Sequence, residues 1–235
     1  MIVLFTDFGP DDIYVGQVKA ALCKRAPQGT PIVDLLHGVP NFDACAGAHL
    51  LAALYPHFPR GSVFLAVVDP GVGGARDAVA VHADGRWFVG PDNGLLSVLA
   101  ARTSAVQAWR ITGRSEALSV SFHGRDLFAP IAADIAGGQL MSGCLEEISA
   151  LQVNFGPEDC AQIIYIDHYG NALTGLRAAA VDPATRFSVR GQHIAHARVF
   201  SAVPAGEPFW YCNSVGLVEI AVNRGNAANS LGLAV

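Results

Sequence analysis

The chain has 235 residues, of which 51% are hydrophobic and only 15% charged, and its net charge is −5. A charged fraction below the usual value of about 25% is typical of a globular protein with much surface to bury, and the lack of any basic run argues against a nucleic-acid partner. The N-terminus has neither the basic start nor the cleavage site of a signal peptide, and no apolar run reaches the roughly 18 residues of a membrane span. We therefore expect a cytoplasmic protein that does not bind a membrane.

The first part of the sequence alternates strand-like and helix-like segments. Short apolar runs predict strands at residues 2–5, 32–36 and 63–68. Between them we expect helices over about residues 11–25 and 43–57, where aspartates in N-cap positions precede helical segments. Strands that alternate with helices of this length predict a parallel sheet with both faces covered.

Three polar residues follow these predicted strands directly. Asp7, His37 and Asp69 each stand at or just past the end of an apolar run. In open parallel sheets, ligands bind beyond the carboxyl ends of the strands. The shared position of the three residues therefore predicts a ligand site at this edge of the sheet.

The next segments continue the same domain. Residues 78–81 and 87–89 predict a hairpin, and the Pro-Asp-Asn-Gly sequence at 91–94 predicts a turn. Further helices are expected over about residues 95–101 and 125–136, the second of which is ended by a Gly-Gly pair.

From about residue 162 the pattern changes to short alternating runs, separated by turn residues at a spacing of roughly 8–12 residues. The expected strands are residues 163–166, 172–176, 186–189, 193–199, 209–212 and 218–221. Residues 145–159 are expected to form a linker. The predicted fold class is α/β, with an N-terminal Rossmann-like α/β sandwich (residues 1–150) that holds a mostly parallel sheet, and a small C-terminal antiparallel β-barrel (residues 160–235).

Two glycine-flanked acidic segments carry the strongest chemical signal. They are Val-Asp-Pro-Gly-Val-Gly at 68–73, followed by Arg76, and Phe-His-Gly-Arg-Asp at 122–126. Asp69, Arg76 and His123 supply a carboxylate, a permanent cation and a titratable ring, which together can orient and activate a water molecule. Each of these three residues also has a purely structural explanation. Asp69 can cap a turn, Arg76 can pair with a surface acid, and His123 can lie in the core.

Other kinds of site have weaker signals. The sequence contains no complete dinucleotide fingerprint, no H-E-x-x-H motif and no G-x-S-x-G elbow. A metal site stays open as an alternative, with Asp7, Asp69, Asp92 and His123 as candidate ligands.

Six motifs occur in order along nearly the whole chain. They are TDFG-x-x-D-x-YVG (6–16), DPGVG-x-x-R (69–76), PDNG (91–94), FHGRD-x-FAP (122–130), D-x-YGN (167–171) and NS-x-G-x-x-EIAVN-x-GNA (213–227). This series resembles that of the S-adenosyl-L-methionine hydrolases, adenosine-forming enzymes related to the fluorinase and chlorinase that use the same substrate. The resemblance implies an N-terminal α/β domain, a small C-terminal β-barrel and a homotrimer. It also implies that the substrate lies between the N-terminal domain of one subunit and the C-terminal domain of its neighbour.

The resemblance also implies roles for single residues. Asp69, Arg76 and His123 match the water-activating set of the hydrolases, and the halogenases replace the aspartate and the histidine by groups that form a halide pocket. Asp7 matches the acid that binds both ribose hydroxyls. The other implied substrate contacts are Phe42 and Phe122 along the nucleoside, Asn171 and the backbone of Arg224 at the adenine edge, Asp12, Asp167 and Ser214 at the methionine end, and Phe8 and Asn213.

We therefore expect the protein to hydrolyse S-adenosyl-L-methionine to adenosine and L-methionine, by attack of an activated water at the ribose C5′ atom, without a cofactor. The alternatives are a non-catalytic sensor of S-adenosylmethionine or adenosine, a halogenase that uses the same substrate, and a metal-dependent hydrolase. From the sequence alone, the individual roles of Asp69, Arg76 and His123 cannot be separated.

Overall fold

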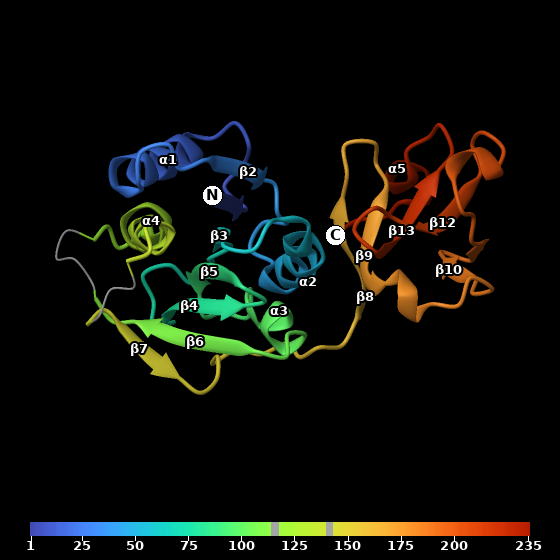
Figure 1. Cartoon of the computed structure of the whole chain (residues 1–235). Helices are drawn as coiled ribbons and strands as arrows, with labels where there is room; N and C mark the ends of the chain where they lie inside the picture. Colours follow the sequence, from blue (N-terminus) through green and yellow to red (C-terminus); the bar gives the residue numbers. More distant parts are fainter. Residues whose placement is uncertain (114–117, 140–142) are drawn as a thin grey trace. The chain divides into compact units, whose positions relative to one another are not determined.

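A computed structural model describes residues 1–113, 118–139 and 143–235 of the chain (Figure 1). The chain divides into two compact units, Met1–Pro157 and Glu158–Val235. Each unit has its own sheet and its own hydrophobic core. Within the described ranges, no helix combines the length and the hydrophobicity that crossing a membrane requires.

The described part of the first unit is built on a seven-stranded sheet with the order β2-β1-β3-β5-β4-β6-β7. Its strands are β1 (Ile2–Thr6), β2 (Ile32–Leu36), β3 (Val63–Val67), β4 (Ala78–Ala83), β5 (Arg86–Pro91), β6 (Val106–Ile111) and β7 (Leu145–Ile148). Strands β2, β1, β3 and β5 run parallel, whereas β4, β6 and β7 extend the sheet by antiparallel pairing. The sheet is therefore mixed, with the predicted parallel part on its β2 side.

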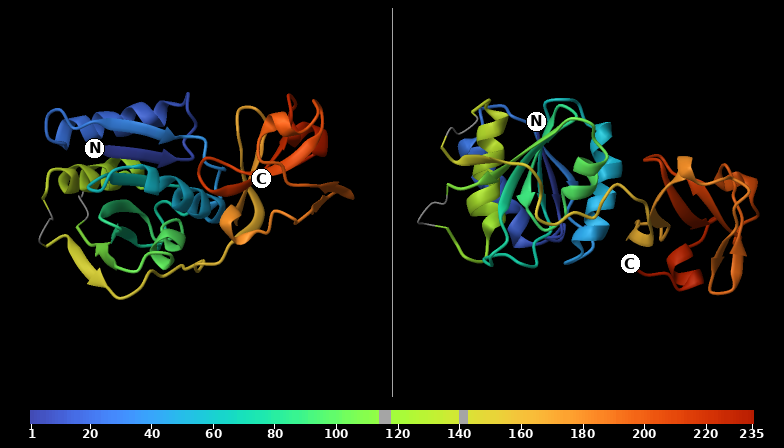
Figure 2. Two further views of the ribbon diagram at one scale, coloured as in Figure 1. Left: turned by 45° about the vertical axis from the view of Figure 1, so that its right-hand side comes forward. Right: turned by 90° about the horizontal axis from the view of Figure 1, so that it is seen from below.

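Helices cover both faces of this sheet (Figure 2). Helices α1 (Ile13–Arg25) and α4 (Ala129–Ala136) lie together on one face, and α2 (Ala44–Leu54) and α3 (Ser97–Ala101) on the other. A 3₁₀ turn, Tyr55–His57, follows α2, and a π-helical turn, Gly124–Phe128, leads directly into α4. The helices bury both faces of β1 and β3, which is why these strands appear in the sequence as continuous apolar runs.

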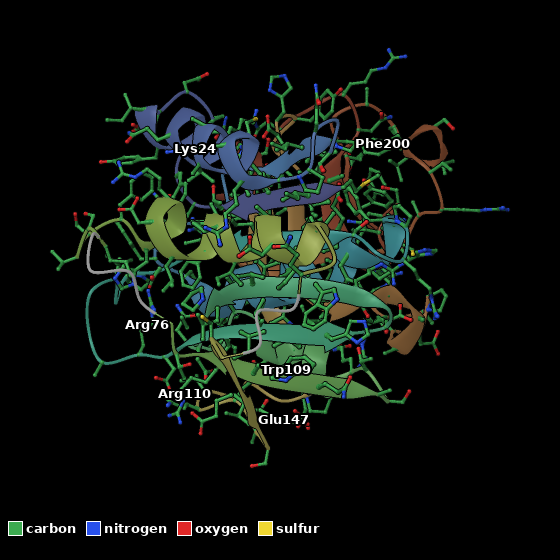
Figure 3. All side chains as sticks on the ribbon, turned by 60° about the vertical axis from the view of Figure 1, so that its left-hand side comes forward. Lys24, Arg76, Trp109, Arg110, Glu147 and Phe200 are labelled. Atoms are coloured by element: carbon green, nitrogen blue, oxygen red, sulfur yellow. The ribbon has the colours of Figure 1, made fainter. Side chains whose placement is uncertain are left out.

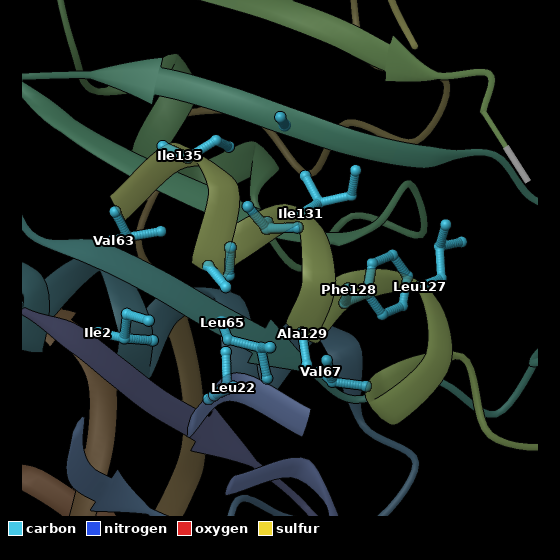
Figure 4. Close-up of a cluster of buried hydrophobic side chains, with 14 of the residues drawn as sticks. Ile2, Leu22, Val63, Leu65, Val67, Leu127, Phe128, Ala129, Ile131 and Ile135 are labelled. Carbon is cyan, nitrogen blue, oxygen red and sulfur yellow. The ribbon is translucent and has the colours of Figure 1, made fainter. Parts of the chain in front are cut away.

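One hydrophobic core of the first unit lies between the sheet and α4 (Figure 4). Alternate residues of β3, Val63, Leu65 and Val67, belong to this core together with Ile131 and Ile135 of α4. All five side chains are at most 8% exposed. Alternation along β3 therefore directs one set of side chains toward α4, as expected for a strand of period two.

The strand directions bring several loops to one edge of the sheet. The carboxyl ends of β1, β3 and β5 lie at the same edge because these strands are parallel neighbours. Strand β4 begins at that edge because it pairs antiparallel with β5, Ala78 opposite Pro91. The loop after β1 and the loop between β3 and β4 therefore meet, and they contain Asp7, Asp69 and Arg76.

The second unit is an antiparallel structure. Its elements are β8 (Cys160–Ile166), β9 (Ala172–Arg177), β10 (Phe187–Val189), β11 (Gln192–Ile194), β12 (Pro208–Cys212), β13 (Leu217–Val222), α5 (Ala227–Leu231) and the 3₁₀ turns Ala178–Ala180 and Phe200–Ala202. Four strands form a sheet with the order β12-β13-β9-β8, and β10 pairs with β11 in a separate ribbon. Trp210 anchors the core and donates its indole N–H to the carbonyl of Thr185 over 2.9 Å. The coarse prediction of a small antiparallel unit agrees with this arrangement, whereas closure into a barrel stays a prediction.

Several expected elements differ from the observed ones. The expected linker 145–159 is wrong at its start, because Leu145–Ile148 forms the edge strand β7. Strand β6, beside it, was not expected, and Figure 3 labels Trp109 and Arg110 on β6 and Glu147 on β7. Both strands carry charged or polar residues on an exposed side, so their apolar pattern is weak. Tertiary pairing defines them instead, including an ion pair from Arg110 to Glu146 at 2.7 Å.

Two further differences concern irregular backbone. The helix expected over residues 125–136 begins as the π-helical turn Gly124–Phe128, and only Ala129–Ala136 is α-helical. The strand expected over 193–199 is ordered as β11 only up to Ile194, after which His196 makes an isolated bridge to Trp210. Helix α5, close to the C-terminus, was not expected because it has only five residues.

Candidate active site

The loop between β3 and β4 contains two of the three predicted catalytic residues. Asp69 follows β3, and Arg76 precedes β4. Two successive turns fold the loop, in which the amide of Val72 donates to the carbonyl of Asp69 over 3.2 Å and the amide of Gly74 donates to that of Gly71 over 3.0 Å. This compact path returns Arg76 to the side chain of Asp69.

Arg76 binds both other members of the trio. Its Nε donates to Oδ1 of Asp69 over 3.0 Å, and its Nη2 donates to the second carboxylate oxygen, Oδ2. The same Nη2 donates to Nδ1 of His123 over 2.9 Å, and the guanidinium lies 5.2 Å from the centre of the Phe128 ring. The side chains of Asp69 and Arg76 are only 6% and 11% exposed, so this ion pair is shielded from solvent. The structure thus joins residues 47 positions apart in one hydrogen-bonded group.

The contact from Arg76 indicates the protonation state of His123. A guanidinium has only donors, so Nδ1 of His123 must accept and carries no proton. The ring is therefore neutral in this arrangement, with its proton on Nε2.

A close approach between the two motif loops makes this contact possible. A Cβ atom on Gly73, whose φ is +78°, would lie 2.3 Å from the carbonyl oxygen of Val120. Only glycine fits at this place, both for its positive φ and for the absent side chain. Gly73 therefore lets the Asp69 loop contact the segment that leads into His123.

A cavity of about 110 Å³ lies beside the trio. It is lined by Asp7, Phe8, Phe42, Val67, Asp69, Val72, Ser121, Phe122, His123 and Gly124. Asp69 and His123 thus face the cavity. Arg76, which binds both, is not among the described lining residues.

Asp7 enters the cavity from the end of β1. The amide of Phe42 donates to its Oδ2 over 3.1 Å. Burial raises the pKa of Asp7 above its ordinary value, and the nearby negative charge of Asp69 raises this pKa further, against the opposing effect of the backbone hydrogen bonds. Two carboxylates therefore share one small cavity, an arrangement that favours a cationic or hydroxyl-bearing ligand.

The backbone around Asp7 is held by a buried polar contact. The hydroxyl of Thr6 lies 2.8 Å from Nδ1 of His37, and Nε2 of His37 lies 3.1 Å from Asp34. The carbonyl of His37 also accepts from the amide of Gly9 over 2.7 Å. His37, which the sequence placed at the same edge, thus supports the loop that carries Asp7 and does not line the cavity in the described part of the chain.

Aromatic side chains form the other wall. Phe8 and Phe122 pack edge to face with ring centres 5.8 Å apart, and Tyr14 packs against Phe122 at 5.3 Å. Phe42 is 72% exposed and has a left-handed backbone with φ of 65°, a conformation that costs energy for a non-glycine residue. Asp12 lies outside this wall as the N-cap of α1, where it accepts from the amide of Ile13 over 2.6 Å.

The second unit has a cavity of its own, of about 370 Å³. It is lined by Tyr169, Asn171, Phe200, Val222, Arg224 and Gly225. Two predicted adenine contacts, Asn171 and Arg224, thus come together here. Arg224 has a left-handed backbone with φ of 56°, so a predicted ligand contact in each unit has this uncommon conformation.

Asp167 is engaged within its own loop. Its Oδ1 accepts from the amides of Tyr169 and Asn171 over 2.9 and 2.8 Å, and its Oδ2 accepts from the side chain of Asn171 over 3.0 Å. Asp167 therefore orients Asn171 toward the cavity that Asn171 lines.

Asn213 also holds a turn. Its Oδ1 accepts from the amides of Val215 and Leu217 over 3.1 and 2.9 Å, and its Nδ2 donates to the buried Glu219 over 2.8 Å. Ser214 is exposed at the tip of this turn. Burial raises the pKa of Glu219 above its ordinary value, with the charge of Asp167 adding to the effect, so these motifs are coupled electrostatically.

Sequence reasoning missed several contributors. Tyr14, Ser121 and Phe200 lie in the aromatic wall or line the cavities without having been named. The first two stand inside or next to motifs already identified, which was a usable signal. Phe200 lies in a 3₁₀ turn outside any motif, and only the fold brings it to the cavity.

The described residues contain no cluster of three or more His, Cys, Asp or Glu side chains arranged to hold a metal ion. Of the four ligands considered from the sequence, Asp7, Asp69 and His123 line one cavity. Asp92 instead accepts from the amide of Gln152 over 3.0 Å.

The fold and the site define a two-unit α/β protein with a charged ligand cavity at the carboxyl ends of parallel strands. The model of the SAM hydroxide adenosyltransferase N-terminal domain matches residues 2–144, and that of the C-terminal domain of the same family matches residues 161–235. This chain belongs to the SAM hydroxide adenosyltransferase family.

Individual relatives agree with this assignment. The chain is 41% identical to the (R)-S-adenosyl-L-methionine hydrolase of Thermus thermophilus over 99% of its length and 95% of the relative, and 37% identical to that of Salinispora arenicola over 96% and 91%. A fluorinase of Actinopolyspora mzabensis is more distant, at 23% identity over 97% of this chain and 92% of the fluorinase. Among solved structures, an uncharacterized conserved protein from Thermotoga maritima superposes with a TM-score of 0.89 at 31% identity, covering 100% of this chain and 96% of that one.

Proposed function

We infer that this protein hydrolyses (R)-S-adenosyl-L-methionine to adenosine and L-methionine. The observation that carries the inference is the assembly of Asp69, Arg76 and His123 at one cavity beside Asp7. Relatives with this activity align with nearly the whole chain.

The reaction requires an aligned nucleophile but no general acid. Water attacks C5′ of the ribose while the C5′–S bond breaks, and the bonding electron pair stays on sulfur. The sulfonium becomes the neutral thioether of methionine, so no acid has to protonate the leaving group. The water loses one proton to an acceptor in the site and then to solvent. The enzyme must therefore align one water with C5′ and accept its proton.

We assign these tasks to the trio as follows. Asp69 accepts a hydrogen bond from the water, directs it at C5′ and takes its proton. His123 contacts the water as a neutral ring from the cavity wall, and Arg76 holds Asp69 and His123 in register. Two findings support this division, because Asp69 and His123 line the cavity and Arg76 binds both of them.

The binding roles are part of the same proposal. Asp7 binds the two ribose hydroxyls, and Phe8, Phe42 and Phe122 line the nucleoside. Asn171 and the backbone of Arg224 recognise the adenine edge. The groups proposed for the methionine end are Asp12, Asp167 and Ser214, with Asn213 shaping the turn that carries Ser214.

We propose that the active protein is a cytoplasmic homotrimer that needs no cofactor. Each subunit has an N-terminal domain of residues 1–150 and a C-terminal β-barrel domain of residues 160–235. The substrate binds between the N-terminal domain of one subunit and the C-terminal domain of a neighbouring subunit. Exposed apolar side chains around both cavities support an interface there. Phe42 and Val120 are 72% and 78% exposed in the first unit, and Tyr169 is 73% exposed in the second. Large apolar side chains that gather around ligand sites are typical of surfaces covered by a partner.

The decisive experiment is incubation of the purified protein with S-adenosylmethionine in ¹⁸O-labelled water. We expect equal amounts of adenosine and methionine, with one ¹⁸O atom at the 5′ position of adenosine. Binding without products would identify a sensor, and a 5′-halo-adenosine formed in the presence of chloride or fluoride would identify a halogenase. Loss of activity with excess chelator would identify a metal-dependent hydrolase.

A further inference from the structure

The Pro-Asp-Asn-Gly motif at residues 91–94 has no role in the chemistry described so far. It lies at the carboxyl end of β5, and β5 lies between β3 and β4 in the sheet. The loop that carries Asp69 and Arg76 connects β3 to β4. This loop must therefore cross over the end of β5, where the motif stands.

The motif makes hydrogen bonds to both ends of that loop. The side-chain Nδ2 of Asn93 donates to the carbonyl of Val68, directly before Asp69, over 2.8 Å. The backbone amide of Asp92 donates to the carbonyl of Asp77, directly after Arg76, over 2.9 Å. Nη1 of Arg76 approaches the same Asp77 carbonyl at 3.4 Å, so the second contact also reaches the guanidinium.

The loop needs such contacts because its own backbone is permissive. It contains three glycines, at positions 71, 73 and 74, which leave many backbone conformations accessible. The ion pair between Asp69 and Arg76 is internal to the loop and sets only their mutual arrangement. Its direction relative to the cavity has to come from contacts outside the loop.

We propose that Asn93 is a positioning residue for hydrolysis, which aims the Asp69–Arg76 pair at the attacking water by anchoring the Val68 carbonyl. Asn93 is not among the described residues that line the cavity. Its Oδ1 accepts from the amide of Leu95 over 3.3 Å, which sets the amide plane so that Nδ2 faces Val68. This proposal rests on the proposed function, because it assigns a step within it.

The test uses two substitutions and a matched control. Asn93→Ala removes the anchor, and Asn93→Asp keeps the acceptor for Leu95 but has no donor for Val68. Ser62→Ala is the control, because the buried Ser62 hydroxyl donates to the carbonyl of Pro59 over 2.7 Å just before β3, at the opposite edge of the sheet. The control also loses one side-chain bond to a backbone carbonyl in the same unit.

We expect both Asn93 variants to lower kcat by about 10–100-fold, because a misplacement of about 1 Å can have an effect of this size. KM should stay within about threefold, since Asp7 and the aromatic wall are anchored by other strands, and Ser62→Ala should leave kcat unchanged. In an Asp69→Ala background, Asn93→Ala should change kcat less than about twofold, because a residue that acts through a partner loses its effect when the partner is absent.

Two kinetic results would overturn the proposal. One is an unchanged kcat in both Asn93 variants, and the other is an equal loss of kcat with and without Asp69. Hydrogen exchange gives a readout that does not depend on turnover, because Asn93→Ala should speed amide exchange over residues 69–77 and Ser62→Ala should not. If the wild-type protein formed no adenosine, the proposed function would fail, and unchanged exchange over 69–77 in the Asn93 variants would separately refute the anchor.

Discussion

The cavities of the two units differ in how their charges are held. In the first unit, Asp69, Arg76 and His123 hold one another in a shielded group whose acid and imidazole face the cavity. In the second, the nearby acid Asp167 is satisfied by hydrogen bonds from its own loop, and an amide, Asn171, faces the cavity. Two carboxylates, Asp7 and Asp69, therefore line the first cavity, whereas no carboxylate is among the described lining residues of the second.

Because the two cavities differ in this way, we expect substitutions in the two units to change different kinetic constants. Substitutions at the trio should lower kcat, because the proposed mechanism has its members act on the water and on the developing charge. Substitutions around the second cavity should raise KM, because they remove binding that is the same in the ground state and the transition state.

The largest effect is expected for Arg76→Ala. We expect kcat to fall by about 10²–10⁴-fold, and the free energy of unfolding to fall by about 3–5 kcal/mol, because Asp69 is left buried without its partner. Steady-state kinetics and urea unfolding measure the two effects. Arg76→Lys is the control, since it keeps the charge but cannot bind both carboxylate oxygens and His123 together. A variant with wild-type kcat would remove Arg76 from the mechanism.

His123→Ala should have the next largest effect, a loss of about 100-fold in kcat with KM within about threefold. His123→Asn keeps an acceptor for Nη2 of Arg76 and should recover stability without recovering kcat. Parallel melting curves and product assays compare the two variants. Recovery of full turnover by asparagine would show that His123 only supports Arg76.

Asn171→Ala tests the second cavity. We expect KM to rise by about 10-fold, in line with the roughly 1–3 kcal/mol cost of removing one partner of a buried hydrogen bond, while kcat stays within about threefold. Initial rates over a range of substrate concentrations measure both constants. A fall in kcat as large as that of His123→Ala would contradict the proposal that the second cavity binds the substrate without acting in the chemical step.

The smallest effect is expected for the stability of Asp7→Asn. Burial and the charge of Asp69 raise the pKa of Asp7 in the folded state, so the folded protein holds this proton more tightly than the unfolded chain does. The carboxyl therefore destabilises the fold increasingly as pH rises from its ordinary pKa through the raised one, and causes no loss below both values. Asparagine should thus raise Tm by about 1–3 °C at pH 7 and give no gain at pH 3.

The same variant should weaken substrate binding, because an amide replaces the carboxylate that we propose accepts both ribose hydroxyls. In the wild-type protein, KM should rise as the pH falls through the raised pKa of Asp7, and this rise should be absent from Asp7→Asn. Melting curves and KM profiles over pH check the two expectations. A Tm gain that persisted at pH 3 would point to packing as its cause.

Much of the fold could be predicted because some segments carry their own signal. The strands β1 and β3 are buried on both faces and therefore appear as unbroken apolar runs. The edge strands β6 and β7 could not be predicted in this way. Their exposed sides carry residues such as Gln107 and Glu147, and pairing across the sheet defines their limits. Closely spaced runs in the second unit predicted antiparallel strands but not which of them pair.

In the candidate site, too, some properties follow from local sequence and others only from tertiary contacts. The sequence by itself determined the chemical groups, Asp69, Arg76 and His123, and their places at strand ends and sharp turns, because the glycines and the apolar runs around them are local features. Only the tertiary structure decided that Arg76 bonds to both Asp69 and His123, and that Asn93 donates to the Val68 carbonyl beside Asp69. These properties depend on distances between residues far apart in the chain, which strand order and the close approach at Gly73 set.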